Sequence, residues 1–325
     1  MRTCISFIIA YLWAAVPIYS QITTTKVAPE KIKKDYEIIV YDSTTNFVGS
    51  NVLSLIGQQL YLPSRKSYRH KYGYKGFFIE YDTPELLTRS EDIVYKCCDS
   101  HNSKYSELNN RYFEVLSVHD HPYKSSSDTY TKKFFLALRE SQTNDILYYE
   151  YDSRMKSSFP FIIVGYFEKE KKESIGQEYI ITGKNWRETV FKEKNPMYDI
   201  ITGEEVVLEK GSIWKVIDLT VEEKHFTLSY IIQNERGNKL TLDLKSIDSP
   251  RRFVYLKETV QDIIKNNPEY WQNILDGKVV IGMTKRMVKL AWGKPKRINK
   301  ASYGDQWVYD NQYLYFKGDI LKSFN

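Results

Sequence analysis

The residues with the clearest chemical potential are two neighbouring cysteines and a few histidines. Cys97 and Cys98 are followed by His101, and His119 and His121 come further along the chain. Thiolate and imidazole are good zinc ligands, and zinc takes about four ligands in a tetrahedral array. Neither group reaches four by itself, so a zinc site would require both groups to converge in the fold. We therefore expect no metal and no other cofactor, with a converged zinc site as the alternative.

Motifs that would mark an enzyme are missing from the sequence. There is no Gly-x-Ser-x-Gly nucleophile elbow and no glycine-rich phosphate loop. A cysteine peptidase needs a thiolate beside a histidine base, but Cys97 and Cys98 lack the Asp-Cys-Ser-Gly signature of cell-wall peptidases. We expect a non-catalytic binding or scaffolding protein. The alternative is a cell-wall or polysaccharide hydrolase whose carboxylates, or cysteine and histidine, converge only in the folded chain.

Aromatic side chains are the best candidates for contacting a partner. The chain holds 27 tyrosines and 15 phenylalanines, and tyrosine and tryptophan often dominate the binding energy of interfaces. We expect several of them, in the connections between strands and on one late strand, to recognise an envelope protein or a glycan. These candidate ligand-binding residues are Tyr68, Tyr72, Tyr74, Phe77, Trp186, Tyr313 and Tyr315.

The first twenty residues are typical of a secretory signal peptide. Arg2 precedes an apolar run over residues 5–16, and the small residue Ser20 stands before Gln21. An uncleaved membrane anchor is the alternative, but spanning a bilayer takes about 20 apolar residues. Cys4 precedes the apolar run, so it is not the acylated cysteine of a lipoprotein. We expect a periplasmic or secreted protein of a Gram-negative-type envelope, with no transmembrane segment after cleavage.

The net charge narrows the class of partner. The net charge of +6 is mild for this length and could favour anionic partners or association with a membrane surface. It disfavours nucleic acid as a partner, as does export.

The cysteine content bears on what stabilises the fold. Neighbouring cysteines rarely bond to each other, so we expect no disulfide framework and a fold that depends on its apolar core.

The middle of the chain contains an internal repeat, in which four successive segments of a first copy match four segments of a second copy. Apolar residues alternate with polar ones in these segments, which predicts strands. Each copy thus has an opening strand, a long connection and a three-stranded meander with a polar turn before its last strand. This order resembles a small SH3-like barrel. The corresponding segments are residues 56–62 and 175–181, 112–118 and 213–219, 134–138 and 226–230, and 146–151 and 239–244.

The last part of the chain changes to helical spacing and then to short strands. Leu256, Val260 and Ile263 recur at helical spacing. Thr284 is a good helix cap, and Gly293 is a natural helix end. Three short strands follow, around residues 297–300, 306–309 and 313–316, and a final short strand is expected at residues 320–321.

The motifs of this C-terminal part resemble the OmlA/SmpA family. They are Gly282-Met283-Thr284 with Val288 and Trp292-Gly293-x-Pro295, then Gln306-Trp307-Val308-Tyr309, then Tyr313-Leu314-Tyr315-Phe316-x-Gly318. The family includes the small lipoprotein of the outer-membrane barrel-assembly machinery and resembles the fold of β-lactamase inhibitor proteins. The resemblance implies two helices on a three-stranded antiparallel sheet, no catalysis, and binding to other proteins.

The predicted fold is mostly β with an α+β C-terminal module. Two SH3-like β-barrels are followed by a helical connector and a domain of helices on a three-stranded sheet. The expected boundaries are 1–20 for the signal peptide, 21–36 for a flexible lead-in, 37–160 and 161–252 for the two β-domains, 253–276 for the connector and 277–325 for the last module.

Overall fold

The computed structural model describes residues 40–125, 128–182, 197–223, 226–247, 254–302 and 304–325. The predicted signal peptide, the lead-in over residues 21–36 and Trp186 lie outside these described residues. Within them, strands outweigh helices, so the prediction of a mostly β protein is confirmed. Among the described residues, none of the helices combines the length and apolar character that crossing a bilayer requires.

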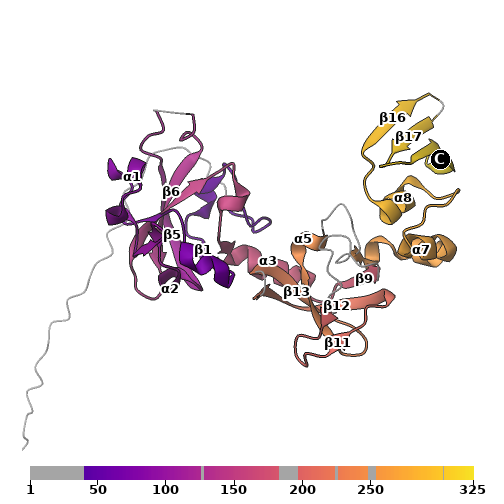
Figure 1. The fold of residues 1–325 in the computed structure, drawn as a ribbon, viewed down its shortest axis with the longest axis horizontal. Helices are drawn as coiled ribbons and strands as arrows, with labels where there is room; N and C mark the ends of the chain where they lie inside the picture. Colours follow the sequence, from indigo (N-terminus) through magenta and orange to yellow (C-terminus); the bar gives the residue numbers. More distant parts are fainter. Residues whose placement is uncertain (1–39, 126–127, 183–196, 224–225, 248–253, 303) are drawn as a thin grey trace, which may run out of the picture. The chain divides into compact units, whose positions relative to one another are not determined.

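The first sheet has six strands in the order β2-β7-β6-β5-β1-β8 (Figure 1). Its centre is the antiparallel meander β5–β6–β7, and the opening strand β1 pairs with β5. Leucines and aromatic residues of these strands form a buried core because every second side chain points to the same face. The strands are β1 Gln59–Leu62, β2 Phe77–Phe78, β5 Arg111–Asp120, β6 Lys133–Glu140, β7 Ile146–Asp152 and β8 Ile162–Ile163.

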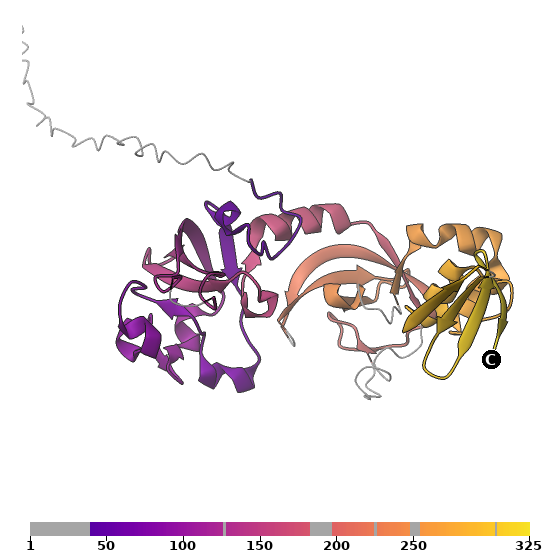
Figure 2. The ribbon, with the colours of Figure 1, turned by 90° about the horizontal axis from the view of Figure 1, so that it is seen from above.

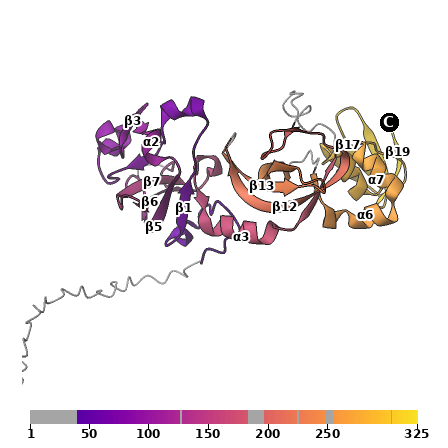
Figure 3. The same ribbon diagram turned by 90° about the horizontal axis from the view of Figure 1, so that it is seen from below.

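The long connection between β1 and β5 has structure of its own. It carries short helical turns and a small two-stranded hairpin, and its strand β2 pairs with the far edge strand β7. Figure 3 labels the hairpin strand β3 and the short helix α2 in this part. The elements before and within the connection are η1 Val52–Leu55, η2 Ser67–Tyr72, α1 Glu85–Thr88, η3 Glu91–Ile93, β3 Cys97–Asp99, β4 Asn102–Ser103 and α2 Tyr105–Leu108; η4 Lys156–Ser158 follows β7.

The second sheet, β14-β13-β12-β9-β15, repeats the order of five strands of the first sheet, β7-β6-β5-β1-β8, and has no counterpart of β2. Its meander is β12–β13–β14, and β9 corresponds to β1 and β15 to β8. Figure 3 shows β12 and β13 curving together along their length. The strands are β9 Glu178–Thr182, β12 Lys210–Glu222, β13 Thr227–Gln233, β14 Lys239–Asp243 and β15 Val254–Leu256; a separate pair is β10 Met197–Tyr198 and β11 Glu205–Val206, and the short helix α5 is Leu244–Ile247.

The two sheets also agree in detail. The register shifts after Val115 in β5 and after Val216 in β12, at positions that the sequence comparison aligned. The glycine before each opening strand donates its N–H to the carbonyl at the equivalent position of the meander. Gly57 donates to Val115 at 2.8 Å, and Gly176 donates to Val216 at 2.9 Å. A bulge inserts one residue and increases the local twist. The sequence correspondence is thus matched by strand order and by bulge position.

Both sheets are open among the described residues. The edge strands are β2 and β8 in the first sheet and β14 and β15 in the second, and closure into a barrel is not found between them. β8 pairs with β1 although it lies past the predicted boundary at residue 160. β15 pairs with β9 although residues 253–276 were expected to form a helical connector. Both strands are too short for their alternation to be recognised in the sequence.

The helix α3 follows β8 and leads into the second sheet, whereas the helices after β15 lead into the C-terminal module. Thr284 Oγ1 accepts a hydrogen bond from the N–H of Met287, as expected of a helix cap, and Gly293 ends the helix with φ 80°. Figure 2 shows the orange helices after β15 beside the yellow C-terminal strands. The elements are α3 Val164–Ser174, η5 Lys257–Thr259, α6 Gln261–Asn266, α7 Pro268–Leu275, α8 Lys285–Trp292, β16 Arg297–Ala301, β17 Gly304–Val308, β18 Tyr313–Lys317 and β19 Ile320–Phe324.

The C-terminal strands form one antiparallel sheet in chain order, β16-β17-β18-β19. Trp307, Leu314 and Phe316 are buried on one face of it. They pack with Met287 and Val288 of α8. The expected three strands and the short last strand are therefore present and together make a four-stranded sheet.

Candidate functional site

The predicted binding residues of the first domain fall into two groups. Tyr68 and Tyr72 lie on η2 and are 60% and 50% exposed. Tyr74 and Phe77 are core residues, so their prediction as surface contacts is wrong. The hydroxyl of Tyr74 donates to the carbonyl of Pro63. Phe77 belongs to β2, and its ring packs at a tilt against that of Tyr149 of β7. Phe77 is turned inward by the pairing of β2 with β7, and Tyr74 by its backbone bridge to Ser103 of β4.

Tyr313 and Tyr315 occupy an exposed face of the C-terminal sheet, with exposures of 41% and 37%. In β18 the exposed and buried residues alternate, so these tyrosines point away from the face that packs on α8. We call this the outer face and define it by two cross-strand rows of residues. The rows are Arg297, Val308 and Tyr313, and Asn299, Gln306 and Tyr315.

Polar groups connect the second row across three strands. The amide nitrogen of Asn299 donates to Oε1 of Gln306 at 2.7 Å. The amide nitrogen of Gln306 in turn donates to the hydroxyl of Tyr315 at 3.1 Å. The three side chains therefore hold one another in place beside the ring of Tyr313. Sequence reasoning missed Asn299 and Gln306, although their positions on predicted strands, out of phase with the buried Trp307, placed them on this face.

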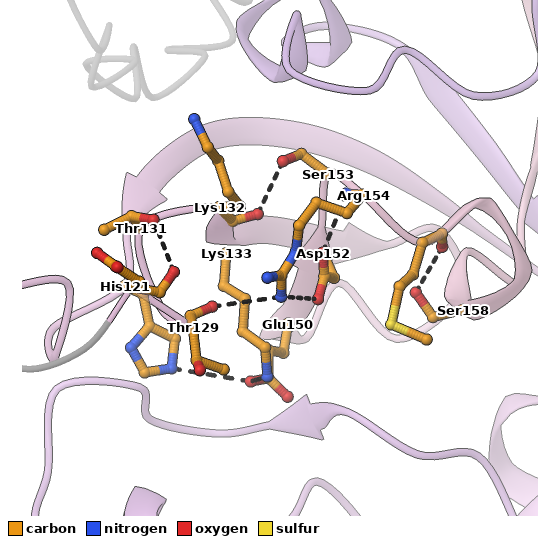
Figure 4. Close-up of polar contacts among 12 residues, drawn as sticks. His121, Thr129, Thr131, Lys132, Lys133, Glu150, Asp152, Ser153, Arg154 and Ser158 are labelled. Atoms are coloured by element: carbon orange, nitrogen blue, oxygen red, sulfur yellow. Dashed lines mark hydrogen bonds and ion pairs between the residues drawn. The ribbon is translucent and has the colours of Figure 1, made fainter.

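A buried ionic cluster surrounds Glu150 on β7 (Figure 4). Its carboxylate accepts hydrogen bonds from Arg89 at 2.6 Å and Lys133 at 2.7 Å, and Nε2 of His121 lies 3.8 Å from it. His121 is 3% exposed and stacks on Tyr130 with the ring centroids 4.3 Å apart. The Tyr123 N–H donates to His121 Nδ1, which leaves Nε2 as the protonated nitrogen facing Glu150.

The cluster favours an ionised Glu150 and a neutral His121. Burial acts to raise the pKa of Glu150, but the charges of Arg89 and Lys133 outweigh it, and the pKa lies below its usual value. Burial lowers the pKa of His121; Glu150 opposes this, and Lys133 and Arg89 add to it. A carboxylate held between two cations is a poor proton donor, so Glu150 does not resemble the general acid of a hydrolase.

Other buried carboxylates among the described residues are likewise engaged by donors. Asp152 accepts from the guanidinium of Arg154, at 2.9 Å from Nη2 (Figure 4). Asp199 accepts three backbone N–H bonds, two within its own turn and one from Lys239 at 2.6 Å. Glu140 accepts two N–H bonds from the turn after β6. Each of these carboxylates orders a turn or an ion pair, which suits a structural role.

The cysteines are bonded to each other, against expectation. A disulfide joins Cys97 and Cys98 on β3, although neighbouring cysteines rarely bond to each other. Both residues are half-buried, and Cys97 packs against the apolar cluster of Phe78 and Ile93. The oxygen of Glu91 and the two sulfurs lie within 4.8 Å of one another.

The histidines do not gather at one point with the cysteines. His101 lies beside Glu91, with 2.5 Å between Nδ1 and Oε1. His119 instead contacts Ser117 at 2.8 Å and the ring of Tyr81. His121 belongs to the Glu150 cluster. The structure therefore brings the cysteines together with Glu91 and, through it, with His101.

Comparison with known proteins gives no relative: no family model, no curated protein and no solved structure matches this chain.

Proposed function

We propose that the protein is a non-catalytic recognition protein that binds a glycan on the outer face of its C-terminal sheet. The observation that carries this proposal is the row of Asn299, Gln306 and Tyr315, joined by hydrogen bonds and flanked by Tyr313. This face lies opposite the side that packs on α8. It offers aromatic rings and fixed polar groups on a flat support.

The chemistry of the row suits sugar rings. Amides donate and accept hydrogen bonds, as sugar hydroxyls do, and the phenol of Tyr315 does both. Tyrosine rings offer an apolar surface to the C–H faces of a sugar while keeping a polar end in water. Arg297 on the same face adds a positive charge, which suits a glycan that carries carboxylate or phosphate groups.

The support behind the row reduces the entropy lost on binding. Trp307, Leu314 and Phe316 fix the same strands from the other side. Side chains that are already ordered lose less conformational freedom when a ligand arrives. A rigid sheet face is therefore better suited to recognition than the connections between strands, where the sequence placed most of the candidates.

The wider setting is also part of the proposal. We place the protein in the periplasm or outside the cell, on the strength of the signal-peptide pattern in residues 1–20. The two open sheets are interpreted as SH3-like units that support the module, because they share strand order and bulge position. The OmlA/SmpA resemblance of residues 277–325 supports a binding role.

The test is binding of the purified full chain to envelope glycans displayed on a surface. Tyr313→Ala together with Tyr315→Ala should weaken glycan binding by about tenfold or more, as expected when central aromatic contacts are removed. The matched control is Tyr198→Ala, since Tyr198 is 54% exposed on the separate β10–β11 pair; its binding should equal that of the wild type. Capture of an envelope protein instead of a glycan through the same tyrosines would show that the partner is a polypeptide and that the glycan assignment is wrong.

A further inference from the structure

Three groups with metal-binding chemistry meet, and a fourth lies beside one of them, in the part of the β1–β5 connection that contains η3 and the β3–β4 hairpin. The sulfurs of Cys97 and Cys98 and a carboxylate oxygen of Glu91 lie within 4.8 Å of one another. His101 adds an imidazole, since its Nδ1 is 2.5 Å from the Glu91 carboxylate. The four residues come from the start of η3, from β3 and from the hairpin turn.

The backbone brings His101 to Glu91 through a tight turn. Ser100 and His101 connect β3 to β4 with φ of 53° and 62°. Two central residues with positive φ are the pattern of a type I′ hairpin turn, which glycine or asparagine usually fills. Such conformations are unfavourable for residues that carry a side chain, and they are often found at functional sites. The turn therefore holds the imidazole where Glu91 can reach it.

The backbone beneath the cluster is held in place by packing and hydrogen bonds, and its outer side is open to solvent. Asp99 anchors the hairpin by accepting the N–H of Tyr105 at 2.7 Å, and Cys97 packs on buried apolar residues. The side chains of Glu91 and His101 are 54% and 79% exposed. A solute can therefore reach the sulfurs from the solvent side, while the backbone beneath them is held in place.

We propose that the reduced cysteine pair binds one soft divalent metal ion of the zinc class, with Glu91 and His101 completing the ligand set. Two thiolates, one imidazole and one carboxylate make a four-ligand set of the kind that zinc accepts in tetrahedral sites. Hard ions such as magnesium prefer oxygen ligands and do not suit the sulfurs. Disulfide formation removes both thiolates and with them the site.

Reduction of the disulfide by a small dithiol is balanced. The dithiol supplies two electrons and two protons, the bond between the sulfurs of Cys97 and Cys98 breaks, and the dithiol becomes a cyclic disulfide. The two new thiols lose their protons when the metal binds, because the thiolate is the ligand form. Metal uptake thus depends on the redox state of this pair.

The experiment compares one protein in two oxidation states. The full chain carries Cys4→Ser, so that Cys97 and Cys98 are its only cysteines. It is reduced with dithiothreitol, freed of reductant without oxygen, and titrated with cadmium ions; the ultraviolet absorption of cadmium thiolate reports sulfur ligation. We expect one ion per reduced chain, displaced by zinc, and none per oxidised chain at the same ion concentration. Equal binding in both states, or no thiolate absorption on reduction, would overturn the proposal.

Variants then separate the two outer ligands from a general effect of charge. Glu91→Gln and His101→Gln should each weaken zinc binding to the reduced chain by about tenfold or more, in line with losses seen when metal-site groups are changed. Glu85→Gln is the control, because Glu85 is an exposed carboxylate in nearby α1; its affinity should not change. If the control loses as much affinity as Glu91→Gln, the carboxylate of Glu91 is not a ligand. Circular dichroism of each variant checks that the fold is retained.

Discussion

At the scale of single residues, Glu150 shows how a buried negative charge is compensated in this protein. Its side chain is 11% exposed, and it lies between Arg89 and Lys133. Removing one member of a buried ion pair leaves the remaining charges without compensation, which is costly, whereas exposed pairs contribute little. Glu150 is thus a stabilising residue whose value depends on its partners.

Glu150→Gln should lower the free energy of unfolding by about 3 kcal/mol, the lower part of the range for broken buried pairs, because Arg89 is partly exposed. The control is Glu114→Gln. Glu114 pairs with Arg139 at 3.1 Å, but both side chains are about half exposed, so its loss should cost less than about 1 kcal/mol. Urea denaturation of both variants measures the difference. Equal costs would show that Glu150 contributes no more than a surface pair.

His121 should make stability depend on pH. Its pKa lies below the ordinary 6.5 in the folded chain, so as pH falls through that value the unfolded chain takes up a proton that the folded chain does not. Stability is therefore complete above about pH 6.5 and decreases toward the lowered folded pKa. In His121→Asn, whose amide oxygen can accept the Tyr123 N–H, this decrease should disappear.

Denaturation of the wild type and His121→Asn, at neutral pH and at a mildly acidic pH above the titration of ordinary carboxylates, tests this expectation. Glu150 adds its own loss of stability at lower pH, below its ordinary value of 4.5, and is common to both proteins. The same acid sensitivity in both would rule out His121 as its source.

At the scale of elements, the C-terminal sheet depends on a close approach of two strands. Gly304 begins β17 with φ 146°, and a Cβ built there would overlap the carbonyl oxygen of Phe316 in β18. Gly318 also has positive φ, 63°, but its added Cβ would meet open space. The two glycines therefore separate the effect of crowding from the effect of backbone conformation.

Gly304→Ala should cost at least about 2 kcal/mol more in unfolding free energy than Gly318→Ala, because only the first substitution must push two paired strands apart. Thermal unfolding followed by tryptophan fluorescence, to which the buried Trp307 of this sheet contributes, compares the two. A smaller cost at residue 304 than at residue 318 would mean that β17 and β18 are less closely constrained than their register indicates.

At this scale, the sequence predicts features that depend on residues close together in the chain, and it does not predict features that depend on distant residues. The Thr284 cap and the alternation in β18 depend on neighbours within a few residues, and both are present. Phe77 depends on the pairing of β2 with β7 on the other side of the first sheet, and Tyr74 depends on its bridge to Ser103 of β4. Such long-range pairing leaves no periodic mark in a short segment, so their burial could not be inferred.

At the scale of the whole molecule, the opening strands of the two sheets differ in what covers them. In β9, Tyr179 and Ile181 pack in the core of the second sheet, while Ile180 belongs to the apolar cluster that α6, α7 and the C-terminal module share. In β1, Leu60 and Leu62 share one core, and Tyr61 between them is partly exposed. A strand buried on both faces has a nearly continuous apolar sequence. The C-terminal module therefore stabilises the second sheet as well as presenting the outer face.

A chain that ends at residue 276 should consequently lose stability in β9. The truncation removes part of the apolar cluster that contains Ile180 and the neighbouring Tyr255, which are 2% and 4% exposed in the full chain. This loss should cost about 2–4 kcal/mol, roughly that of exposing one or two apolar side chains. Hydrogen exchange should show faster opening of β9 with β1 unchanged, and Tyr313→Ala with Tyr315→Ala in the full chain should leave β9 as it is. Unchanged protection of β9 in the shortened chain would contradict this shared core. If β9 is weakened, lost binding by a shortened chain cannot be assigned to the outer face, and point substitutions on that face are the decisive test.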